Sequence, residues 1–248
     1  MDQKNNSVAI PVAIVVGFGL IAVAIFFLGK SNPTNDSPLN KQPGIQETKG
    51  NIPTVTEKDF IRGNPNAPIM IVEYSDYDCP YCKVFHTNMR TIMDDYGISG
   101  KVAWTYRQYP IETLHPTSPK VSEAAFCVGE IAGNEAFWKF TDIVFDSRET
   151  NQLTNITKLG NYAEQAGVNR AEFDSCLSSG RMLERVNSSI SEAQTAKIPG
   201  TPHSIMIVGD QQTTINGAET YSYMKGLIDN VLAQIEGAVP ISSETTTE

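Results

Sequence analysis

The stretch that decides the fold is DYDCPYCKVF, residues 76–85, in which a proline and a tyrosine separate Cys79 from Cys82. A cysteine pair with this spacing can bind a metal ion, close a structural disulfide or exchange electrons with other thiols. The chain has four cysteines in all, so the sequence around the pair and the two remaining cysteines must distinguish these uses.

The flanking sequence predicts that the pair stands where a buried strand passes into a helix. IMIVEY, residues 69–74, is apolar and β-branched, which is typical of a strand inside a sheet, and the turn-forming GNPNAP precedes it. From Pro80 onwards apolar residues recur at helical spacing, and a proline is tolerated in the first turn of a helix. Cys79 is therefore expected at a helix N-terminus.

This position favours an ionised thiol at Cys79. The unpaired N–H groups and the positive end of the helix dipole stabilise an anion, so its pKa is expected below the ordinary cysteine value of about 8.5. Cys82 lies one helical turn further along and within disulfide reach, and we expect it to be more buried. It suits the resolving role, in which it attacks a mixed disulfide formed at Cys79.

The alternatives to redox exchange are weaker. A structural zinc site needs four ligands, and Cys127, Cys176 and the three histidines are scattered along the chain. A static disulfide between Cys79 and Cys82 would close too small a loop to add much stability. We therefore expect a redox-active pair, no metal and no cofactor.

Composition limits the size and the class of the protein. The chain has 248 residues, of which 40% are hydrophobic and 8% aromatic, enough for one core, or for one domain with an insertion. Its net charge of -9 makes a nucleic-acid partner unexpected.

The N-terminal part has the pattern of a membrane anchor. After a short segment at residues 1–7, residues 8–28 form an uncharged apolar run long enough to span a bilayer as one helix. A cleaved signal peptide is the alternative, but the run is longer than is usual and no small-x-small site ends it. A buried core helix is disfavoured because the run has no polar face. The flanking lysines do not settle which side of the membrane the rest occupies.

The predicted domain is framed by two polar segments. Residues 29–53 are rich in Asn, Pro, Gly, Ser and Thr, which predicts a flexible linker. The folded domain is expected at residues 54–237, and residues 238–248 are expected to be a disordered tail.

The second half of the domain contains a helical region and then a return to strands. The region from about residue 117 to 196 contains four helical patterns and no strand pattern. One of these patterns places Leu153, Ile156, Leu159 and Tyr162 on a single face. A strand at 204–208, a hairpin and a last helix from about Glu219 to Ile235 follow, so the sheet should be mixed, with helices on both faces. Thr201 and Pro202 precede that strand, where a proline is also tolerated for purely structural reasons.

These features together resemble a known family. The segment RGNPNAPIMIVEYSDYDCPYC (62–82) and the loop IPGTPH (198–203) carry the sharpest likeness to the bacterial DsbA-like oxidoreductases of the thioredoxin superfamily. Weaker matches are YRQYPIETLHPTS, SEAAFCVGE, FWKFTDIVF and FDSCLSSGR, so the resemblance covers most of residues 60–235. It implies an α/β thioredoxin-like fold with an inserted helical domain, here preceded by one transmembrane helix.

The resemblance also implies roles for site residues. Cys79 would be the nucleophile, Cys82 the resolving cysteine, Pro202 a cis-proline and Thr201 the residue whose backbone pairs with substrate. Glu73 would be the acidic residue beneath the site that moves the proton of Cys82. An exposed edge carboxylate is the alternative for Glu73, but the apolar strand around it argues against that.

Other residues near the pair are less decided. Pro80 and Tyr81 should line the site, and the Pro-Tyr dipeptide leaves the direction of electron flow open. His203 departs from the family pattern; as an imidazolium it would stabilise the thiolate, or it is simply a half-exposed histidine at a strand start. Asp76 fits the family but is equally well explained as a turn residue.

Two further histidines, His86 and His115, are expected to have packing or surface roles.

The function implied is that of an enzyme at the cell membrane. A single-pass anchor would hold the catalytic domain on the extracytoplasmic side, where it oxidises cysteines of exported proteins and is served by a membrane redox partner. A disulfide reductase or isomerase, or a non-catalytic thioredoxin-fold chaperone module, is the alternative.

The two remaining cysteines are expected to pair. Cys127 and Cys176 both fall in the helical insertion, and unpaired thiols in an extracytoplasmic domain would risk mispairing with the active site. We therefore predict a structural Cys127–Cys176 disulfide, with a pair of buried apolar cysteines as the alternative.

Overall fold

The computed structural model describes residues 52–238. The predicted membrane helix at residues 8–28, and nearly all of the predicted linker and tail, lie outside these residues. Within residues 52–238, none of the helices has the length and apolar character that crossing a membrane requires.

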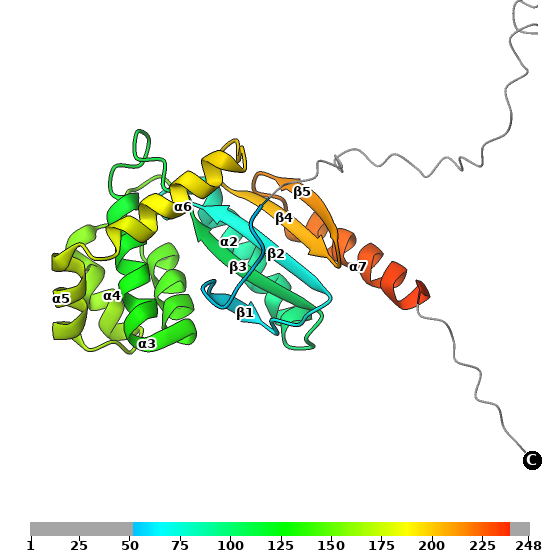
Figure 1. Cartoon of the computed structure of the whole chain (residues 1–248), viewed down its shortest axis with the longest axis horizontal. Helices are drawn as coiled ribbons and strands as arrows, with labels where there is room; N and C mark the ends of the chain where they lie inside the picture. The colour runs from blue at the N-terminus through cyan, green and yellow to red at the C-terminus, as the bar shows by residue number, and fades with distance from the viewer. Residues whose placement is uncertain (1–51, 239–248) are drawn as a thin grey trace, which may run out of the picture. The chain divides into compact units, whose positions relative to one another are not determined.

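The centre of the fold is a sheet of five strands: β1 (Ile61–Gly63), β2 (Ile69–Ser75), β3 (Val102–Gln108), β4 (His203–Val208) and β5 (Gln211–Asn216). Their order is β1-β3-β2-β4-β5, with β2 and β3 parallel and the other pairs antiparallel (Figure 1). The mixed sheet predicted from the sequence is therefore confirmed. All seven residues of β2 are buried, as expected for a central strand.

Strand register places the polar residues of β2. Glu73 is paired with Tyr106 of β3 on one side and with Ser204 of β4 on the other. Its neighbour Tyr74 is paired with His203, the first residue of β4. The end of β2 that leads to the cysteines is thus flanked by the end of β3 and the start of β4.

The helices follow the sequence prediction closely. They are α2 (Pro80–Ile92), a π-helical segment (Met93–Gly97), α3 (Ser118–Asp146), a short 3-10 helix (Ile156–Lys158), α4 (Leu159–Gln165), α5 (Arg170–Ser179), α6 (Leu183–Thr195) and α7 (Tyr221–Ala238). The elements from α3 to α6 form the helical insertion. The two helical patterns expected in its first half are joined as α3, which is interrupted at Gly133, where φ is +80°. Glycine suits this left-handed conformation because it has no Cβ.

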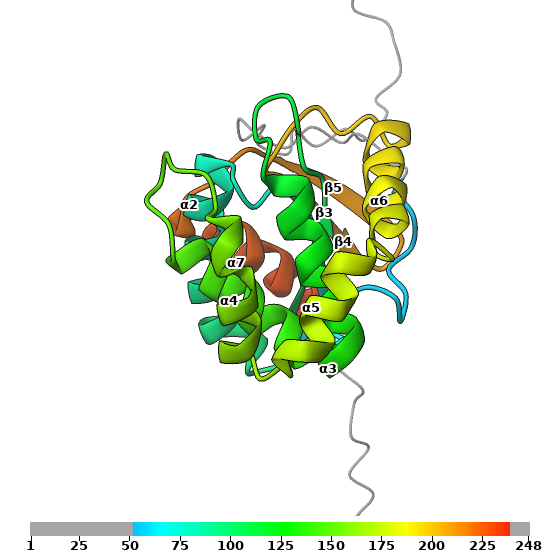
Figure 2. The same cartoon turned by 90° about the vertical axis from the view of Figure 1, so that its left-hand side faces the viewer.

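Each face of the sheet has its own core. On one face Ile69, Ile71 and Trp104 pack with α2, α3 and α7. On the other face Met70, Val72 and Ile205 pack with the end of α6 and with the segment from Ile52 to Val55. Figure 2 shows α2 and α7 on one side of the strands and α6 on the other. Helices on both faces were expected, and the insertion supplies one to each.

A disulfide ties two helices of the insertion. Cys127 of α3 and Cys176 of α5 are bonded, with their Cα atoms 5.9 Å apart. The Asn169 side chain caps the start of α5 by accepting from the N–H groups of Ala171 and Glu172, and the helix ends at Gly180 with φ of +67°. Capping thus fixes both ends of the short helix that carries Cys176.

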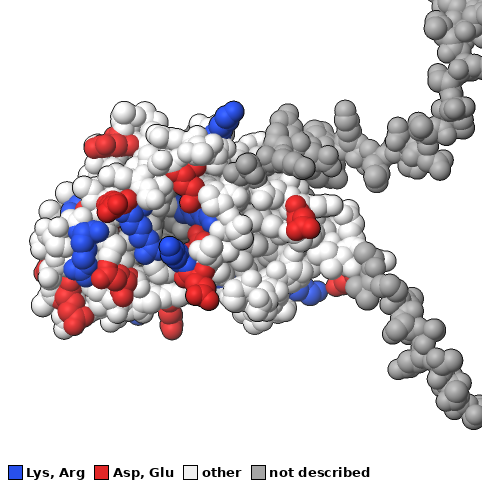
Figure 3. Space-filling view, in the orientation of Figure 1, with Lys and Arg blue, Asp and Glu red and all other residues white. Residues whose placement is uncertain are grey.

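Charged side chains gather over this insertion. In the view of Figure 3, Lys and Arg are interspersed with Asp and Glu over its helices. Arg170 contacts Glu164 and Asp174, and Arg181 contacts Glu130. Exposed pairs of this kind add little stability, so the interior of the insertion depends on packing and on the disulfide.

Some expectations need correction. Leu159 and Tyr162 are buried in the core, but Leu153 and Ile156 are exposed because the chain there is a loop and a short 3-10 helix. The last helix begins at Tyr221 rather than near Glu219. Strands β1 and β3 were not predicted.

Candidate functional site

The cysteine pair stands at the start of α2. Cys79 is the N-cap residue, with extended backbone, and Pro80 occupies the first helical turn. Cys79 is 4% exposed and Cys82 is fully buried; both are free thiols. The relative burial is the one expected for an attacking and a resolving cysteine.

The loop before β4 lies beside this pair. The Cys79 thiol donates to the backbone carbonyl of Thr201 over 3.4 Å, and the peptide bond between Thr201 and Pro202 is cis. Thr201 is half-buried and Pro202 is buried. The structure therefore brings Thr201 and Pro202 to the cysteine that the sequence predicts to be the nucleophile.

The two thiols have opposite electrostatic environments. A hydrogen bond from Cys82 lowers the pKa of Cys79 to about 6, aided by the backbone N–H groups of Cys82 and Tyr81 and by Thr201, against burial. Burial raises the pKa of Cys82 well above its ordinary value, and the neighbouring charges of Cys79 and Glu73 add to this. Near neutral pH the pair therefore holds one thiolate, at Cys79, and one thiol, at Cys82.

Glu73 lies beneath the pair inside the sheet. It is fully buried, and burial raises its pKa to about 8. The indole N–H of Trp104 donates to one of its carboxyl oxygens over 2.9 Å, and the other oxygen has no hydrogen-bond partner among the described residues. The exposed edge carboxylate considered as an alternative is thus excluded, and a protonatable group lies close to Cys82.

Asp76 organises the approach to the pair. It accepts from the N–H of Asp78, from the N–H of Ile111 and from Nδ1 of His115. It is therefore a turn residue that also holds the loop after β3.

Asp78 ties down a second loop. Its carboxylate accepts from the N–H and the hydroxyl of Thr154, over 2.8 and 2.6 Å, and from the hydroxyl of Thr117. The loops before and after α3 are thereby fixed beside the cysteine pair.

Comparison with known proteins gives this arrangement a family. Residues 55–230 match the family model described as Thioredoxin. The chain belongs to the thioredoxin family.

Solved structures share the fold of this chain. α-DsbA1 of Wolbachia pipientis superposes with a TM-score of 0.62 at 22% identity, over 77% of this chain and 98% of that one. Oxidised BdbD from Bacillus subtilis gives 0.60 at 22% identity, over 71% and 93%. These likenesses show the fold, so the predicted DsbA-like thioredoxin fold with a helical insertion is confirmed.

Curated relatives are more varied. Two Na(+)/H(+) antiporters, NhaA 3 of Salinispora tropica and NhaA 1 of Salinispora arenicola, are 27% and 29% identical to this chain over 61% of its residues. The matched region covers only 22% of the length of each antiporter. A Rickettsia bellii relative named "Putative protein-disulfide oxidoreductase" is 24% identical over 84% of this chain and 74% of that protein.

The histidines of this thioredoxin-family chain do not act as cations at the sulfurs. His203 is buried, and burial lowers its pKa, so its imidazole is neutral near pH 7 and the idea of a stabilising imidazolium is disfavoured. His86 is buried between the rings of Trp104 and Phe145, with Nε2 2.8 Å from Asp142. His115 lies against Asp76, as described above. Packing and positioning account for these last two.

Apolar side chains are exposed on the segments that meet at the pair. Tyr81 and Val84 lie on the first turns of α2, and Tyr81 is 67% exposed. Leu114 precedes the histidine that contacts Asp76, and Leu153 precedes the threonine that contacts Asp78; both are exposed. Pro80 is half-buried. The rim of the site is thus apolar.

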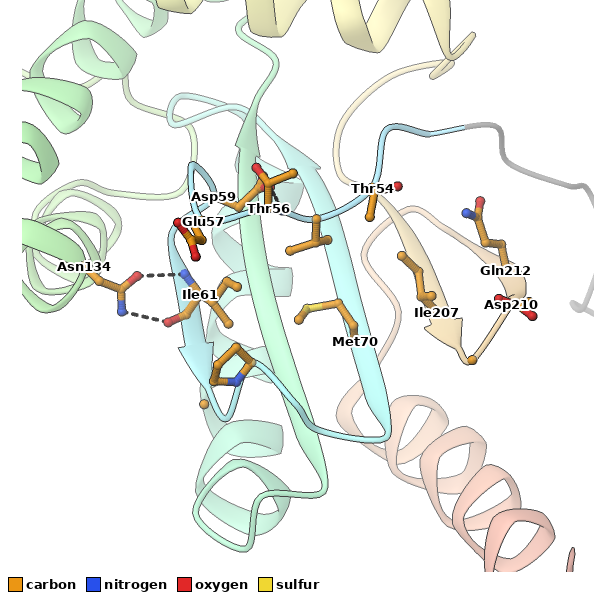
Figure 4. Close-up of a pocket in the computed structure, with 14 residues that line it drawn as sticks. Thr54, Thr56, Glu57, Asp59, Ile61, Met70, Asn134, Ile207, Asp210 and Gln212 are labelled. Carbon is orange, nitrogen blue, oxygen red and sulfur yellow. Dashed lines mark hydrogen bonds between the residues drawn. The ribbon is translucent and has the colours of Figure 1, made fainter.

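A separate cleft lies far from the chemistry. It has a volume of about 890 Å³ and is lined by residues such as Thr54, Met70 and Ile207, on the other face of the sheet and toward the opposite end of β2. Figure 4 shows Asn134 at its edge, whose side chain accepts from the N–H of Ile61 and donates to its carbonyl, both over 2.7 Å. We assign the cleft no part in thiol chemistry.

Sequence reasoning missed three polar residues that shape the site. Trp104 contacts Glu73, Asp78 contacts Thr154, and Arg148 contacts the carbonyl of Cys79. Each of these contacts joins distant parts of the chain. Only the acidic residue next to Cys79 could have drawn attention in the sequence. Among the described residues there is no cluster of three or more His, Cys, Asp or Glu side chains arranged for a metal ion.

Proposed function

We propose that this chain is a membrane-tethered thiol–disulfide oxidoreductase that acts outside the cytoplasm and uses Cys79 and Cys82 to oxidise cysteines of exported proteins. The observation that carries the proposal is the asymmetry of the pair: a thiol of low pKa at the start of α2, next to a buried thiol of high pKa. Family membership and the Rickettsia bellii relative support the same class of reaction.

The exchange proceeds in two balanced steps. A substrate thiolate attacks Cys79 in the Cys79–Cys82 disulfide, and an S–S bond to the substrate forms as Cys82 leaves. Cys82 takes up a proton, which the neighbouring Glu73 can donate because its carboxyl group has a pKa of about 8. A second substrate thiolate then attacks the substrate sulfur of the mixed disulfide and releases Cys79 as a thiolate. The substrate loses two electrons as its disulfide forms, and the enzyme gains them.

The surroundings of the pair support a polypeptide substrate. The Thr201 backbone lies beside Cys79, where an extended substrate segment can form main-chain hydrogen bonds. The apolar rim at Tyr81, Leu114 and Leu153 suits chains that still expose apolar side chains. Oxidation of exported proteins before they finish folding fits both features.

The tether and the redox partner complete the proposal. Residues 8–28 carry the anchor pattern, and a membrane-bound disulfide donor would restore the Cys79–Cys82 disulfide after each turnover. A membrane location brings such a donor and the exported substrates to the same surface.

Measurement of the reduction potential of the Cys79–Cys82 couple tests the direction of transfer. A reduction potential of about -120 mV supports an oxidase, and one of about -270 mV would make the protein a reductase. The companion assay follows disulfide formation in a reduced, unfolded protein substrate, with Cys79→Ser as the control. A wild-type protein that leaves the substrate thiols untouched in either direction would favour the non-catalytic module.

A further inference from the structure

Arg148 is a buried cation that contacts the active-site turn. It lies two residues after the end of α3, and its side chain is 6% exposed. Nε donates to the carbonyl of Tyr77 over 2.9 Å, and Nη2 donates to the carbonyl of Cys79 over 2.8 Å. The remaining nitrogen, Nη1, donates to carbonyls of its own loop, those of Glu149, Thr150 and Gln152.

The guanidinium of Arg148 makes no direct ion pair, because the groups that accept its hydrogen bonds are neutral. All five acceptors are backbone carbonyls, and no carboxylate of the described residues lies within ion-pair distance of Arg148. Burial lowers its pKa, but a guanidinium stays protonated at any physiological pH. A positive charge is therefore held inside the protein at the N-cap of α2.

Few groups share this space with the Arg148 charge. Asp78 is the carboxylate that interacts most strongly with this charge, although its oxygens are hydrogen-bonded to Thr154 and Thr117 and not to Arg148. Cys79, Cys82 and Tyr106 are the other groups whose negative charge would interact with the guanidinium. Of these, only Cys79 is ionised near neutral pH, because burial raises the pKa of the other two.

We propose that Arg148 is a positioning residue of the disulfide exchange: it holds the carbonyls of Tyr77 and Cys79, and its buried charge favours the ionised Cys79 sulfur. The inference rests on the proposed function, since it concerns the same cysteine pair. Holding both carbonyls keeps residues 77–79 in the conformation that directs the N–H groups of the first helical turn at the Cys79 sulfur.

The charge also acts on the redox equilibrium. Reduction of the Cys79–Cys82 disulfide by two glutathione thiols gives one glutathione disulfide, a Cys79 thiolate and a Cys82 thiol; of the two thiol protons one goes to Cys82 and one to solvent. Any group that stabilises the thiolate therefore favours the reduced protein. Among the other ionisable groups around Cys79, Asp78 and Glu73 oppose the thiolate when they are ionised, because they carry the same charge, and the buried His203 is neutral and adds no charge.

The test compares Arg148→Met and Arg148→Lys with the wild type in the full chain. We expect the pKa of Cys79, followed by the ultraviolet absorbance of the thiolate, to rise by about one unit in Arg148→Met. Arg148→Lys keeps the charge but loses the two-carbonyl contact, so a smaller rise is expected. At about pH 7 the equilibrium constant for reduction by glutathione should fall about fivefold in Arg148→Met.

Arg185→Met is the matched control. Its guanidinium is half-buried; it lies 4.2 Å from the centre of the Phe126 ring and donates to the carbonyl of Lys58, and no sulfur is among its partners. This variant should leave the pKa of Cys79 and the glutathione equilibrium unchanged.

An unchanged Cys79 pKa in folded Arg148→Met would overturn the inference while leaving the proposed function intact. If Arg148→Met does not fold cooperatively, Arg148→Lys decides: a raised pKa supports the inference, and a wild-type pKa overturns it. If the wild-type Cys79 itself titrates near about 8.5, the activated thiolate of the proposed function fails instead.

Discussion

Cys79 and Cys82 are only three positions apart, yet the chain gives them opposite acid strengths. Cys79 receives hydrogen bonds from the thiol and the backbone at the first turn of α2, whereas Cys82 points into the core, where ionisation is opposed by burial. A single helical turn separates the two environments, because the free N–H groups of the first turn point at the N-cap residue, while the next turn faces the sheet.

The reduced protein should be alkylated first at Cys79. With a pKa of about 6, half of the Cys79 thiols are ionised at about pH 6, while Cys82 remains protonated. Iodoacetamide treatment at that pH followed by peptide mass mapping should find the label on Cys79 only. The Cys79→Ser variant should stay unlabelled under the same conditions. Equal labelling of both cysteines would contradict the described asymmetry.

Glu73 should make the stability of the protein depend on pH. The pKa of Glu73 is about 4.5 in the unfolded chain and about 8 in the native state. Between these two pH values the native state therefore binds more protons than the unfolded chain. The stability contribution is therefore present below about pH 4.5 and is lost as the pH rises toward 8. Glu73→Gln removes that loss, and its free energy of unfolding at about pH 8 should exceed that of the wild type, by up to about 4 kcal/mol.

Urea unfolding at several pH values measures this difference. The variant should match the wild type most closely at about pH 4, and the gap should widen with rising pH. Glu130→Gln, at an exposed position, serves as the control and should show no such widening. A wild type whose stability does not fall across this range would rule out a carboxyl protonated up to about pH 8.

Local pattern was enough to find Cys79 and Cys82, since one short stretch of sequence contains a strand, a turn and the start of a helix. The family resemblance was needed to connect Glu73 and the loop of Thr201 and Pro202 with them. Arg148 could not be found in this way. Its role depends on a contact between residues 69 positions apart, and nothing in its local sequence distinguishes it from a surface arginine.

Among the elements, β2 and α2 could be predicted and β3 could not. The sequence of β3, VAWTYRQ, mixes apolar residues with Thr, Arg and Gln, yet all seven residues are buried. Tertiary contacts make this possible: Arg107 donates to Asp59 and to Glu192, which come from the N-terminal segment and from α6. A strand whose polar side chains find buried partners far along the chain shows no periodic pattern.

Removal of the disulfide between α3 and α5 should destabilise the protein without changing its redox chemistry. The bond closes a loop of 49 residues, which corresponds to about 4 kcal/mol by chain entropy. The double variant Cys127→Ala/Cys176→Ala should therefore melt roughly 10 °C lower, as expected for a domain of this size.

The same double variant should keep the reduction potential of the Cys79–Cys82 couple, because neither removed sulfur is among the partners of Cys79 or Cys82. A large change in potential would show that the insertion acts on the pair through this bond. An unchanged melting temperature would mean that packing alone holds α3 and α5 together.

For the molecule as a whole, the insertion is part of both cores rather than an appendage. α3 packs on the face of the sheet that carries α2 and α7, and Ala193 of α6 and Ile198, in the segment after it, belong to the core on the other face. The general architecture followed from the order of strand and helix patterns, but this division of the insertion between two faces did not, because the sequence does not state which face a helix covers.

The full chain should partition with membranes. Residues 8–28 are uncharged and apolar over a length that matches a bilayer, so the protein should stay in the membrane fraction through washes with high salt and alkaline carbonate. A variant lacking residues 2–43 should be found in the soluble fraction with the same reduction potential. A full chain released by these washes would contradict the anchor.

The chain has two tryptophans: Trp104 contacts the buried carboxyl group of Glu73, and Trp138 packs against Trp104. Trp104 donates its indole N–H to Glu73, the ring centres of Trp104 and Trp138 are 4.6 Å apart, and the Arg62 guanidinium lies over both. Indole emission is sensitive to nearby charge, and Glu73 in turn is close to the sulfur pair. We therefore expect the intrinsic tryptophan fluorescence to differ between the oxidised and the reduced protein, so that the redox state of the pair can be followed without an attached dye.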